Sequence, residues 1–337
     1  MRVGIAGASG FAGAELLRLA AGHPDMDVVV AGADSQAGRP VGELYRSLAA
    51  AYPALDFSPA GPSELQGLDV VFLALPHGES QQLAPDLVDR VGLLVDLSAD
   101  FRLTQKEAYP QWYGSEHLAP ELLGRFVYGL PELFGPNLAG ASLVAAPGCY
   151  PTAAALALAP LVRGGLVKDS GIIVDAASGV SGAGRQPAEH THFNVVDEDF
   201  TAYGLFTHRH TPEIEQATGA QVLFTPHLAP MNRGILATCY ARPTRDLSDA
   251  DLRQALDQAY DGQPFMVVSD QPPSTKATLG SNAAHVSARV DPRTGWVLSM
   301  CALDNLGKGA SGQAVQCMNL ALGLPETEGL SAVGVYP

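Results

Sequence analysis

The sequence predicts an α/β fold, in which a doubly wound parallel sheet is joined to an α+β domain with a large, mainly antiparallel sheet. Two features support this prediction. The first half alternates short, unbroken apolar runs with helical segments, which is typical of parallel strands buried on both faces. The second half has longer strand-like runs between loops rich in His, Gly and Pro. We expect the first domain to comprise residues 1–148 with 307–337, and the second to comprise residues 149–306.

In the first domain, a short buried strand over residues 3–6 leads into a helix over residues 12–21, which Gly22 and Pro24 end. Further buried strands are expected at residues 28–31, 70–75, 93–97 and 143–146. The alternation of helices with unbroken apolar strands implies a parallel sheet with right-handed crossovers.

The second domain begins with an expected helix over residues 151–161. Its expected strands are residues 172–176, 222–224, 235–241, 284–290 and 296–303. A last helix over residues 310–322, ended by Gly323 and Pro325, returns to the first domain. A sheet of this size often faces a partner subunit, so we expect a homodimer or a homotetramer.

The composition limits the classes of protein to which this chain can belong. Of its 337 residues, 47% are apolar and 16% are charged, which excludes a disordered chain. A net charge of −15 argues against a nucleic-acid partner. The bases are 16 Arg and 4 Lys, so we expect arginines to hold an anionic small-molecule substrate.

The four cysteines are scattered and form no C-x-x-C pair, which argues against a disulfide framework and against a zinc site. The sequence shows no signal-peptide pattern, and no uncharged apolar stretch reaches the ~20 residues that cross a bilayer. We therefore expect a reduced, cytoplasmic protein with no membrane partner and no metal.

A glycine loop with the spacing G-x-x-G-x-x-G joins the first strand to the first helix. Gly7 permits the tight turn, Gly10 admits a pyrophosphate to the backbone, and Gly13 lets the helix pack on the sheet. The helix N-terminus adds about half a positive charge facing the phosphates. This context predicts Rossmann-like dinucleotide binding, with a structural turn as the alternative. The expected contact residues are Gly7, Ser9, Gly10, Phe11, Ala12 and Gly13.

Three residues bear on which dinucleotide is bound. Asp34 lies about 20 residues past the loop, where an acid usually binds the ribose 2′-hydroxyl of NAD. Ser35 and Arg39 are close by, and either could contact the 2′-phosphate of NADP. The position of Asp34 favours NAD, and a solvated loop acid is an equal alternative.

Cys149 lies between an expected strand and a helix, in the turn Ala-Pro-Gly-Cys-Tyr-Pro-Thr. The sulfur should therefore lie at a helix N-terminus, which favours the nucleophilic thiolate. The other three cysteines lie inside regular apolar elements, where a thiol is usually a small buried hydrophobe. We predict that Cys149 is the nucleophile.

A Cys nucleophile needs an acid or base, and the run Thr-His-Arg-His-Thr-Pro-Glu from residue 207 to Glu213 is the densest polar cluster. General acid–base chemistry, a metal site and a solvated loop are the three explanations. The spacing of His208 and His210 does not match common zinc motifs, so acid–base chemistry is favoured.

Further anion-binding candidates follow expected strands. A glycine-rich run from Ser178 ends at Arg185 and could lie against a cofactor, although an ordinary mobile loop is equally possible. Arg102 follows a buried strand at the end that faces ligands in open α/β sheets. Arg233 lies just before another strand.

Eight motifs occur in one order along the chain: GASGFAGAELLRL, LALPHG, DLSADFR, APGCYPTAAALAL, ASGVSGAGR, FTHRHTPEI, FTPHLAPMNRGI and DNLGKGASGQAVQ. Together they resemble the type 1 N-acetyl-γ-glutamyl-phosphate reductase family, also called N-acetyl-glutamate semialdehyde dehydrogenases, of arginine biosynthesis. The resemblance extends from Arg2 to about Glu328, and PGCYPT and HRHTPEI are its most specific motifs.

The resemblance implies an NADPH-dependent acyl-phosphate reductase. In it, Cys149 would attack the acyl phosphate of N-acetyl-glutamyl 5-phosphate and expel phosphate. The resulting thioester would accept a hydride from NADPH, and the hemithioacetal would collapse to N-acetyl-glutamate 5-semialdehyde. His208 matches the family's acid/base residue, and Glu213 matches an acid that orients the site.

The resemblance also assigns residues to the cofactor and the substrate. Arg102 matches a phosphate-binding arginine of the related aspartate-semialdehyde dehydrogenases. Ser178 and Gly182 match the nicotinamide-side loop, and Asn305 would approach the nicotinamide amide. The arginines, with Arg185 and Arg233 beside Arg102 as candidates, suit a substrate that carries both a carboxylate and a phosphate.

Alternative functions stay open. An aspartyl- or aminoadipyl-phosphate reductase would share the fold, although the aminoadipyl branch has a GCN-type motif where this chain has GCYPT. A redox sensor would bind NADP without turnover. A cysteine hydrolase or acyltransferase would use Cys149 without a dinucleotide.

Overall fold

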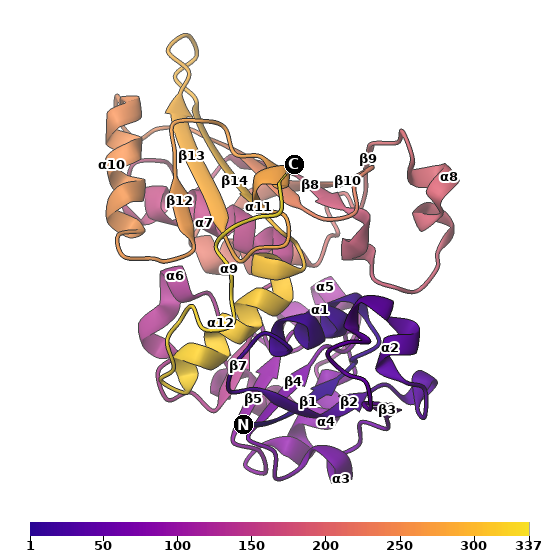
Figure 1. Ribbon diagram of the computed structural model, residues 1–337. Coiled ribbons are helices and arrows are strands. Elements are labelled where there is room, and N and C mark those ends of the chain that lie inside the picture. Colours follow the sequence, from indigo (N-terminus) through magenta and orange to yellow (C-terminus); the bar gives the residue numbers. More distant parts are fainter. Residues whose placement is uncertain (337) are drawn as a thin grey trace. The chain divides into compact units, whose positions relative to one another are not determined.

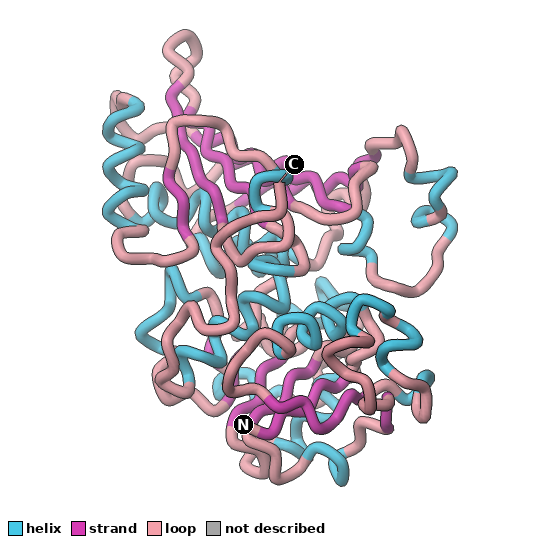
Figure 2. The backbone as a smooth tube through the Cα atoms, in the orientation of Figure 1, coloured by secondary structure: helices cyan, strands magenta, loops and turns pink. Residues whose placement is uncertain are grey.

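The computed structural model describes residues 1–336 and divides into two compact units (Figures 1 and 2). The first unit comprises Met1–Pro147 with Ala310–Leu330. The second comprises Gly148–Gly309 with the residues from Ser331 onward. The residues that follow Ser331 add to the second unit through backbone hydrogen bonds, in which Val335 N–H donates to Leu279 O at 2.7 Å.

The first unit is built on a seven-stranded sheet in the order β3-β2-β1-β4-β5-β7-β6, and every pairing is parallel. The strand order reverses between β1 and β4, which is where ligands bind in open α/β sheets. Its strands are β1 (Arg2–Ala6), β2 (Asp27–Gly32), β3 (Phe57–Ser58), β4 (Val70–Leu73), β5 (Leu93–Asp96), β6 (Val127–Tyr128) and β7 (Leu143–Ala145).

Both faces of this sheet are buried, because successive residues of a strand enter different apolar clusters. Val70 and Phe72 pack in one cluster with Leu16 and Met318, whereas Val71 and Leu73 pack in the other. The helices of the unit are α1 (Phe11–Ala20), α2 (Val41–Leu44), α3 (Pro62–Leu65), α4 (Ser80–Leu87), α5 (Ala108–Tyr113), α6 (Pro131–Phe134) and α12 (Gly312–Ala321).

The second unit has a mixed seven-stranded sheet in the order β12-β13-β14-β11-β8-β10-β9. Four of its six pairings are antiparallel, and only β8–β10 and β12–β13 are parallel. The strands are β8 (Ile172–Gly179), β9 (Thr201–Ala202), β10 (Val222–Ala229), β11 (Ile235–Ala241), β12 (Met266–Val268), β13 (Ala284–Val290) and β14 (Val297–Leu303). The helices are α7 (Cys149–Arg163), α8 (Phe193–Val196), α9 (His210–Thr218), α10 (Asp249–Ala259) and α11 (Thr275–Thr278).

Helix α7 packs on one face of this sheet, where the strand side chains are buried. The Ser299 hydroxyl of β14, for example, donates to Ala157 O of α7 at 2.7 Å. The alternate side chains of β8, β11 and β14, such as Ile173, Tyr240 and Met300, are only half-buried. The predicted fold class, a doubly wound parallel sheet with an α+β domain, is confirmed.

Several elements differ from their predicted limits, and two of these differences have a clear structural cause. The last helix begins at Gly312 and not at residue 310, because a π-helical turn over Gly307–Ser311 precedes it. Strand β10 continues through Pro226, which would ordinarily interrupt a strand. The carbonyl of Pro226 accepts the Tyr203 N–H beyond the short edge strand β9, so the N–H that proline lacks belongs to an edge of the sheet.

Candidate active site

The glycine loop lies in the first unit between β1 and α1, and its backbone is tightly folded. Gly7 N–H donates to Gly32 O at 2.9 Å, and Gly10 N–H donates to Gly7 O at 3.0 Å. Gly7 has a φ of +84°, and a Cβ there would lie 2.2 Å from the carbonyl oxygen of Ala74. A Cβ on Gly13 would lie 2.3 Å from Gly7 O, so both positions require glycine.

The N-terminus of α1 is suited to a phosphate group. Gly10 is the N-cap, and no side chain in the described part of the chain caps this helix. The loop residues from Ser9 to Ala12 are half-buried. Helix-terminal N–H groups without an intrahelical partner, together with the positive end of the helix dipole, favour an anion. The residues predicted to contact the pyrophosphate therefore surround one helix end.

The residues predicted to select the dinucleotide follow β2. Asp34 directs its carboxylate to the protein backbone, where it accepts the Ala60 N–H at 3.2 Å. Ser35 lies in the same short turn. Arg39 donates to Gln36 Oε1 at 3.1 Å, and 38% of its side chain is exposed. Asp34 is exposed and Arg39 is half-buried, so both side chains are accessible to a cofactor.

Arg102 is held against the ends of two strands of the first unit. Its Nε donates to Ala146 O at 2.8 Å, and its Nη2 donates to Leu97 O at 2.7 Å. The residue is 8% exposed. Because these bonds occupy part of the guanidinium fork, Arg102 has fewer donors for a phosphate than its position in the sequence indicates.

Cys149 lies in the second unit as the first residue of α7, with Gly148 as the N-cap. The Oε1 atom of Glu213, on α9, accepts the Gly148 N–H at 2.8 Å, and Glu213 is fully buried. A Cβ on Gly309 would lie 2.8 Å from the Cβ of Cys149, so the Gly309 backbone packs against the cysteine. Cys149 itself is half-buried, at a helix N-terminus that stabilises a thiolate.

His208 lies among aromatic rings, one of which belongs to Tyr150, the residue directly after Cys149. Its ring centroid is 5.7 Å from that of Tyr150, 5.5 Å from that of Tyr203 and 4.8 Å from that of His210. Burial, followed by the positive charge of Arg209, lowers the pKa of His208 to about 4. The imidazole is therefore neutral near pH 7.

The hydrogen bond on His208 defines its tautomer. Its Nδ1 accepts the His210 N–H at 3.1 Å, and a neutral ring that accepts at Nδ1 carries its proton on Nε2. His208 therefore presents an N–H donor. Such a group suits a substrate oxygen on which negative charge develops.

Ser178, Gly182 and Asn305 gather in the second unit. A Cβ on Gly182 would lie 2.9 Å from Ser178 Oγ and 3.8 Å from Asn305 Nδ2. The amide of Asn305 is engaged at both ends: Oδ1 accepts the Gly234 N–H at 2.7 Å, and Nδ2 donates to Ser181 Oγ at 2.9 Å. Asn305 therefore ties the glycine-rich turn after β8 to the turn before β11.

The two remaining candidate arginines have different surroundings. Arg233 donates to Asp304 Oδ1 from Nε at 3.1 Å and from Nη2 at 2.8 Å. Asp304 is fully buried and also accepts the Gly280 N–H at 2.6 Å, so it fixes the guanidinium. Arg185, in contrast, is exposed in its loop.

Sequence reasoning missed the two tyrosines beside His208. Tyr203 Oη donates to Tyr150 Oη at 3.2 Å, and Tyr150 Oη donates to His227 O at 3.0 Å. Burial raises the pKa of Tyr203 to about 12 and also raises the pKa of Tyr150, so both phenols stay protonated at neutral pH. The position of Tyr150, directly after Cys149, was the available signal.

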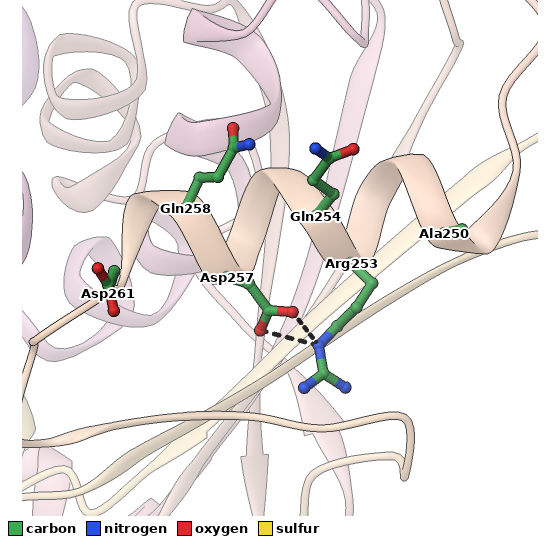
Figure 3. Close-up of a pocket in the computed structure, with 6 residues that line it drawn as sticks. All are labelled: Ala250, Arg253, Gln254, Asp257, Gln258 and Asp261. Atoms are coloured by element: carbon green, nitrogen blue, oxygen red, sulfur yellow. Dashed lines mark hydrogen bonds and ion pairs between the residues drawn. The ribbon is translucent and has the colours of Figure 1, made fainter.

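A hollow on the surface of the second unit lies away from these residues, along the outer face of α10 (Figure 3). Its side chains are polar, and Arg253 there pairs with Asp257 at 2.8 Å. The lining residues are Ala250, Arg253, Gln254, Asp257, Gln258 and Asp261. We assign it no function, because all of them belong to one surface helix and its last turn.

Residues 1–336 contain neither a metal-binding cluster nor a membrane-spanning helix. No three His, Cys, Asp or Glu side chains are grouped there as they would be around a metal ion. None of the helices that the structure describes is long and apolar enough to cross a bilayer.

Comparisons with known proteins identify the class. The family described as "Semialdehyde dehydrogenase, NAD binding domain" matches residues 2–141, and "Semialdehyde dehydrogenase, dimerisation domain" matches residues 149–305. Aspartate semialdehyde dehydrogenase II from Vibrio cholerae and an aspartate semialdehyde dehydrogenase with NADP from Candida albicans share the fold. Each has a TM-score of 0.70 and 15% identity over 95% of this chain and 98% of its own. The two family matches, over residues 2–141 and 149–305, define a semialdehyde dehydrogenase with an NAD-binding domain.

More similar relatives identify the family. A protein named N-acetyl-gamma-glutamyl-phosphate reductase from Symbiobacterium thermophilum is 50% identical over all of this chain and 99% of its own length. One from Salinispora tropica is 48% identical with the same coverage. The chain belongs to the N-acetyl-gamma-glutamyl-phosphate reductase family. The predictions of an oxidoreductase of amino-acid biosynthesis and of this reductase activity are confirmed.

Proposed function

We propose that this chain reduces N-acetyl-L-glutamyl 5-phosphate to the 5-semialdehyde with NADPH, through a thioester on Cys149. The observation that carries the thioester route is the placement of Cys149 at the N-terminus of α7, with the turn before it fixed by Glu213. A thiolate held in this way is a ready nucleophile for an acyl phosphate.

The covalent route has two stages, formation of the thioester and its reduction, and neither stage requires a metal. The Cys149 thiolate adds to the carbonyl carbon, a C–S bond forms, and the C–O bond to the phosphate breaks with its electron pair on phosphate. A dinucleotide held by the glycine loop would supply the hydride that reduces the thioester carbon. The C–S bond then breaks, the aldehyde leaves, and the thiolate is restored. The covalent route divides one difficult reduction into two easier steps.

His208 acts in this proposal as a donor from Nε2 to the oxygen on which charge develops. The hydrogen bond that His208 Nδ1 accepts from the His210 N–H and the lowered pKa of His208 both support a neutral imidazole that donates from Nε2. The thiolate of Cys149 would then be stabilised by the N-terminus of α7 more than by proton removal by His208. Glu213 positions the turn, and the protonated phenols of Tyr150 and Tyr203 pack beside the imidazole.

The glycine loop of the first unit would hold the pyrophosphate, and Ser35 with Arg39 would hold the 2′-phosphate of NADP. The bond from Ala60 to Asp34 supports this choice over NAD, because it engages the competing acid. The Candida albicans neighbour with NADP agrees with it. Ser178, Gly182 and Asn305 would form the nicotinamide side. The first unit thus binds the dinucleotide, and the second carries catalysis and dimerisation.

Arg102, Arg185 and Arg233 are the proposed contacts for the phosphate and carboxylates of the substrate. Arg233 is the best oriented of them, since the buried carboxylate of Asp304 fixes its guanidinium and 22% of the arginine side chain remains exposed. A planar fork held in this way suits a carboxylate.

We propose that the second unit forms the dimer through the open face of its sheet. The half-buried side chains of β8, β11 and β14 on that face are Ile173, Asp175, Ala177, Leu236, Thr238, Tyr240, Leu298 and Met300. Strand register places them side by side, as in the rows Ile173–Tyr240–Leu298 and Asp175–Thr238–Met300. A half-apolar sheet face of this kind is typical of a subunit interface. The four free cysteines fit a reduced, cytoplasmic compartment.

The reverse reaction tests the proposed function. N-acetyl-glutamate 5-semialdehyde and NADP⁺ are mixed with the wild type or with Cys149→Ser, with and without inorganic phosphate. We expect NADPH to form only with the wild type and only with phosphate. Formation by Cys149→Ser at the wild-type rate would overturn the thioester.

The same assay separates the alternative functions. Turnover of the aspartyl or aminoadipyl semialdehyde, but not of the glutamyl semialdehyde, would show that the enzyme has a different substrate from the one proposed. NADP⁺ binding without turnover of any aldehyde would indicate a sensor.

A further inference from the structure

Two hydroxyl groups from distant parts of the first unit bind the carbonyl side of the glycine loop. Tyr45, directly after α2, donates from Oη to the Ser9 carbonyl at 2.7 Å. Ser311, at the start of α12, donates from Oγ to the Ala12 carbonyl at 2.8 Å. The two donors lie 36 and 299 residues from their acceptors in the sequence.

A hydrogen bond to a carbonyl also acts on the N–H of the next residue, because the two groups share one rigid peptide plane. The Ser9 carbonyl fixes the plane that carries the Gly10 N–H, and this N–H donates to Gly7 O at 3.0 Å. The Ala12 carbonyl fixes the plane that carries the Gly13 N–H, in the first turn of α1. A bonded carbonyl additionally polarises its peptide group, which makes the N–H a better donor.

We propose that Tyr45 and Ser311 are positioning residues for the dinucleotide. Tyr45 holds the peptide plane whose Gly10 N–H closes the loop onto Gly7 O, and Ser311 holds the plane that carries the Gly13 N–H. Both hydrogen bonds thereby keep the loop in the shape that surrounds the pyrophosphate. No side chain in the described residues caps α1, so the bonds on the carbonyl side are the side-chain support that the structure shows for this loop. The inference rests on the proposed binding of NADP by this loop.

Tyr52 provides a matched control. Its Oη donates to the Leu17 carbonyl, also at 2.7 Å, and Leu17 belongs to the same helix α1 but lies in a later turn. Both tyrosines are half-buried. Tyr45→Phe and Tyr52→Phe therefore each remove one tyrosine hydroxyl from a carbonyl of this segment, and only the first removes it from the loop.

The test measures affinity for NADP⁺ and steady-state kinetics for the wild type, Tyr45→Phe, Ser311→Ala and Tyr52→Phe, with melting temperatures as the measure of stability. Losing one positioning hydrogen bond should raise the Kd and KM for NADP⁺ about three- to tenfold for Tyr45→Phe and Ser311→Ala. The kcat should stay within about twofold, because an ordered loop affects binding of the cofactor and not the cysteine chemistry. Tyr52→Phe should leave the Kd for NADP⁺ unchanged, even if its melting temperature falls as much as that of Tyr45→Phe.

Adenosine 2′-monophosphate is a second probe, since it has the adenosine and the 2′-phosphate but no pyrophosphate. Tyr45→Phe should weaken the binding of NADP⁺ without weakening the binding of adenosine 2′-monophosphate. Equal weakening of both probes, an unchanged Kd for NADP⁺, or the same effect in Tyr52→Phe would overturn the proposal. A wild-type chain that fails to bind NADP⁺ would instead overturn the cofactor assignment on which the proposal rests.

Discussion

At the scale of single residues, the cysteine turn depends on a carboxylate contributed by α9. Glu213 is fully buried and accepts the Gly148 N–H, one residue before Cys149. Removing the acceptor would leave a buried N–H without this partner and would allow the turn to move. Small displacements of a reacting group can cost about 100-fold in rate. We therefore expect Glu213→Ala to lower kcat about 10–100-fold and Glu213→Gln, whose amide oxygen still accepts, to lower it less.

A neighbouring glutamate separates positioning from general stability. Glu215, on the same helix, accepts the Val222 N–H at 3.1 Å, away from the cysteine turn. Glu215→Ala should lower stability with little change in kcat. The rate of Cys149 alkylation by iodoacetamide gives an independent readout of the turn. Wild-type kcat and alkylation in Glu213→Ala would show that the carboxylate does not position the cysteine.

The charge state of His208 is a second prediction at this scale. Burial and then Arg209 lower its pKa to about 4, so it should stay neutral between pH 5 and 8. NMR titration of the imidazole Cε1–H resonance, assigned with His208→Gln, measures this directly. Arg209→Gln should raise the pKa toward 6.5, with burial still holding it below that value. A titration midpoint near pH 6.5 for His208 in the wild type would contradict the lowered pKa.

His208→Gln also removes the proposed donor to the substrate oxygen. We expect this substitution to lower kcat about 10²–10⁴-fold.

The sequence predicted the residues whose signal is local and missed those whose partners are distant. The glycine loop and Cys149 are recognisable because strand, turn and helix follow one another within a few residues. The hydrogen bond from the Gly148 N–H to Glu213 spans 65 residues. The sequence therefore indicated that Glu213 belongs to the site but not that it accepts from Gly148. The engaged amide of Asn305 and the carbonyl partners of Arg102 were unpredictable for the same reason.

At the scale of elements, the apolar runs predicted the long strands, whereas short and polar elements were missed. Strands β3, β6 and β9 have two residues each, too few for a periodic pattern. Helix α10 carried an unused signal, since Ser248 and Asp251 form a capping box at its start. Pro226 hid most of β10, because a proline is compatible with a strand only where its missing N–H faces an edge.

Asp96, at the end of strand β5, makes the stability of the folded state depend on pH. Asp96 is fully buried, and this burial, followed by the charge of Asp100, raises its pKa from 3.8 to about 6. The folded state therefore holds this proton more tightly than the unfolded state, so the contribution of Asp96 to stability falls as the pH rises from about 4 to about 6. A shift of this size corresponds to about 2–3 kcal/mol.

Asp96→Asn removes that titration while keeping an oxygen for the Ser98 N–H, which Asp96 now accepts at 3.0 Å. Urea denaturation at several pH values tests the sign. The stability of the wild type relative to Asp96→Asn should fall between pH 4 and pH 7. Parallel pH profiles for the two proteins would show that Asp96 is not the titrating group.

At the scale of the whole molecule, the open face of the second sheet should set the oligomeric state. Helix α7 packs on the opposite face, and the side chains of Tyr240, Leu298 and Met300 on the open face are half-buried. In a two-fold interface each substitution occurs twice, so Met300→Asp would add two carboxylates to a contact that already holds Asp175 of each subunit. Because Met300 lies opposite Thr238 near the middle of β11 and β14, the change should disrupt the interface and not its rim.

Sedimentation velocity on the wild type and on Met300→Asp tests this prediction. We expect the wild type to sediment as a dimer or a tetramer and Met300→Asp to dissociate by one level at the same concentration. Gln258→Asp, on the outer face of α10 that Figure 3 shows, is the control and should assemble as the wild type does. The folded state of the variant is checked by its circular dichroism spectrum and its melting temperature, because Met300 and the glycine loop belong to different units and NADP⁺ binding reports only on the latter. A Met300→Asp protein that binds NADP⁺ and assembles like the wild type would place the interface on another surface.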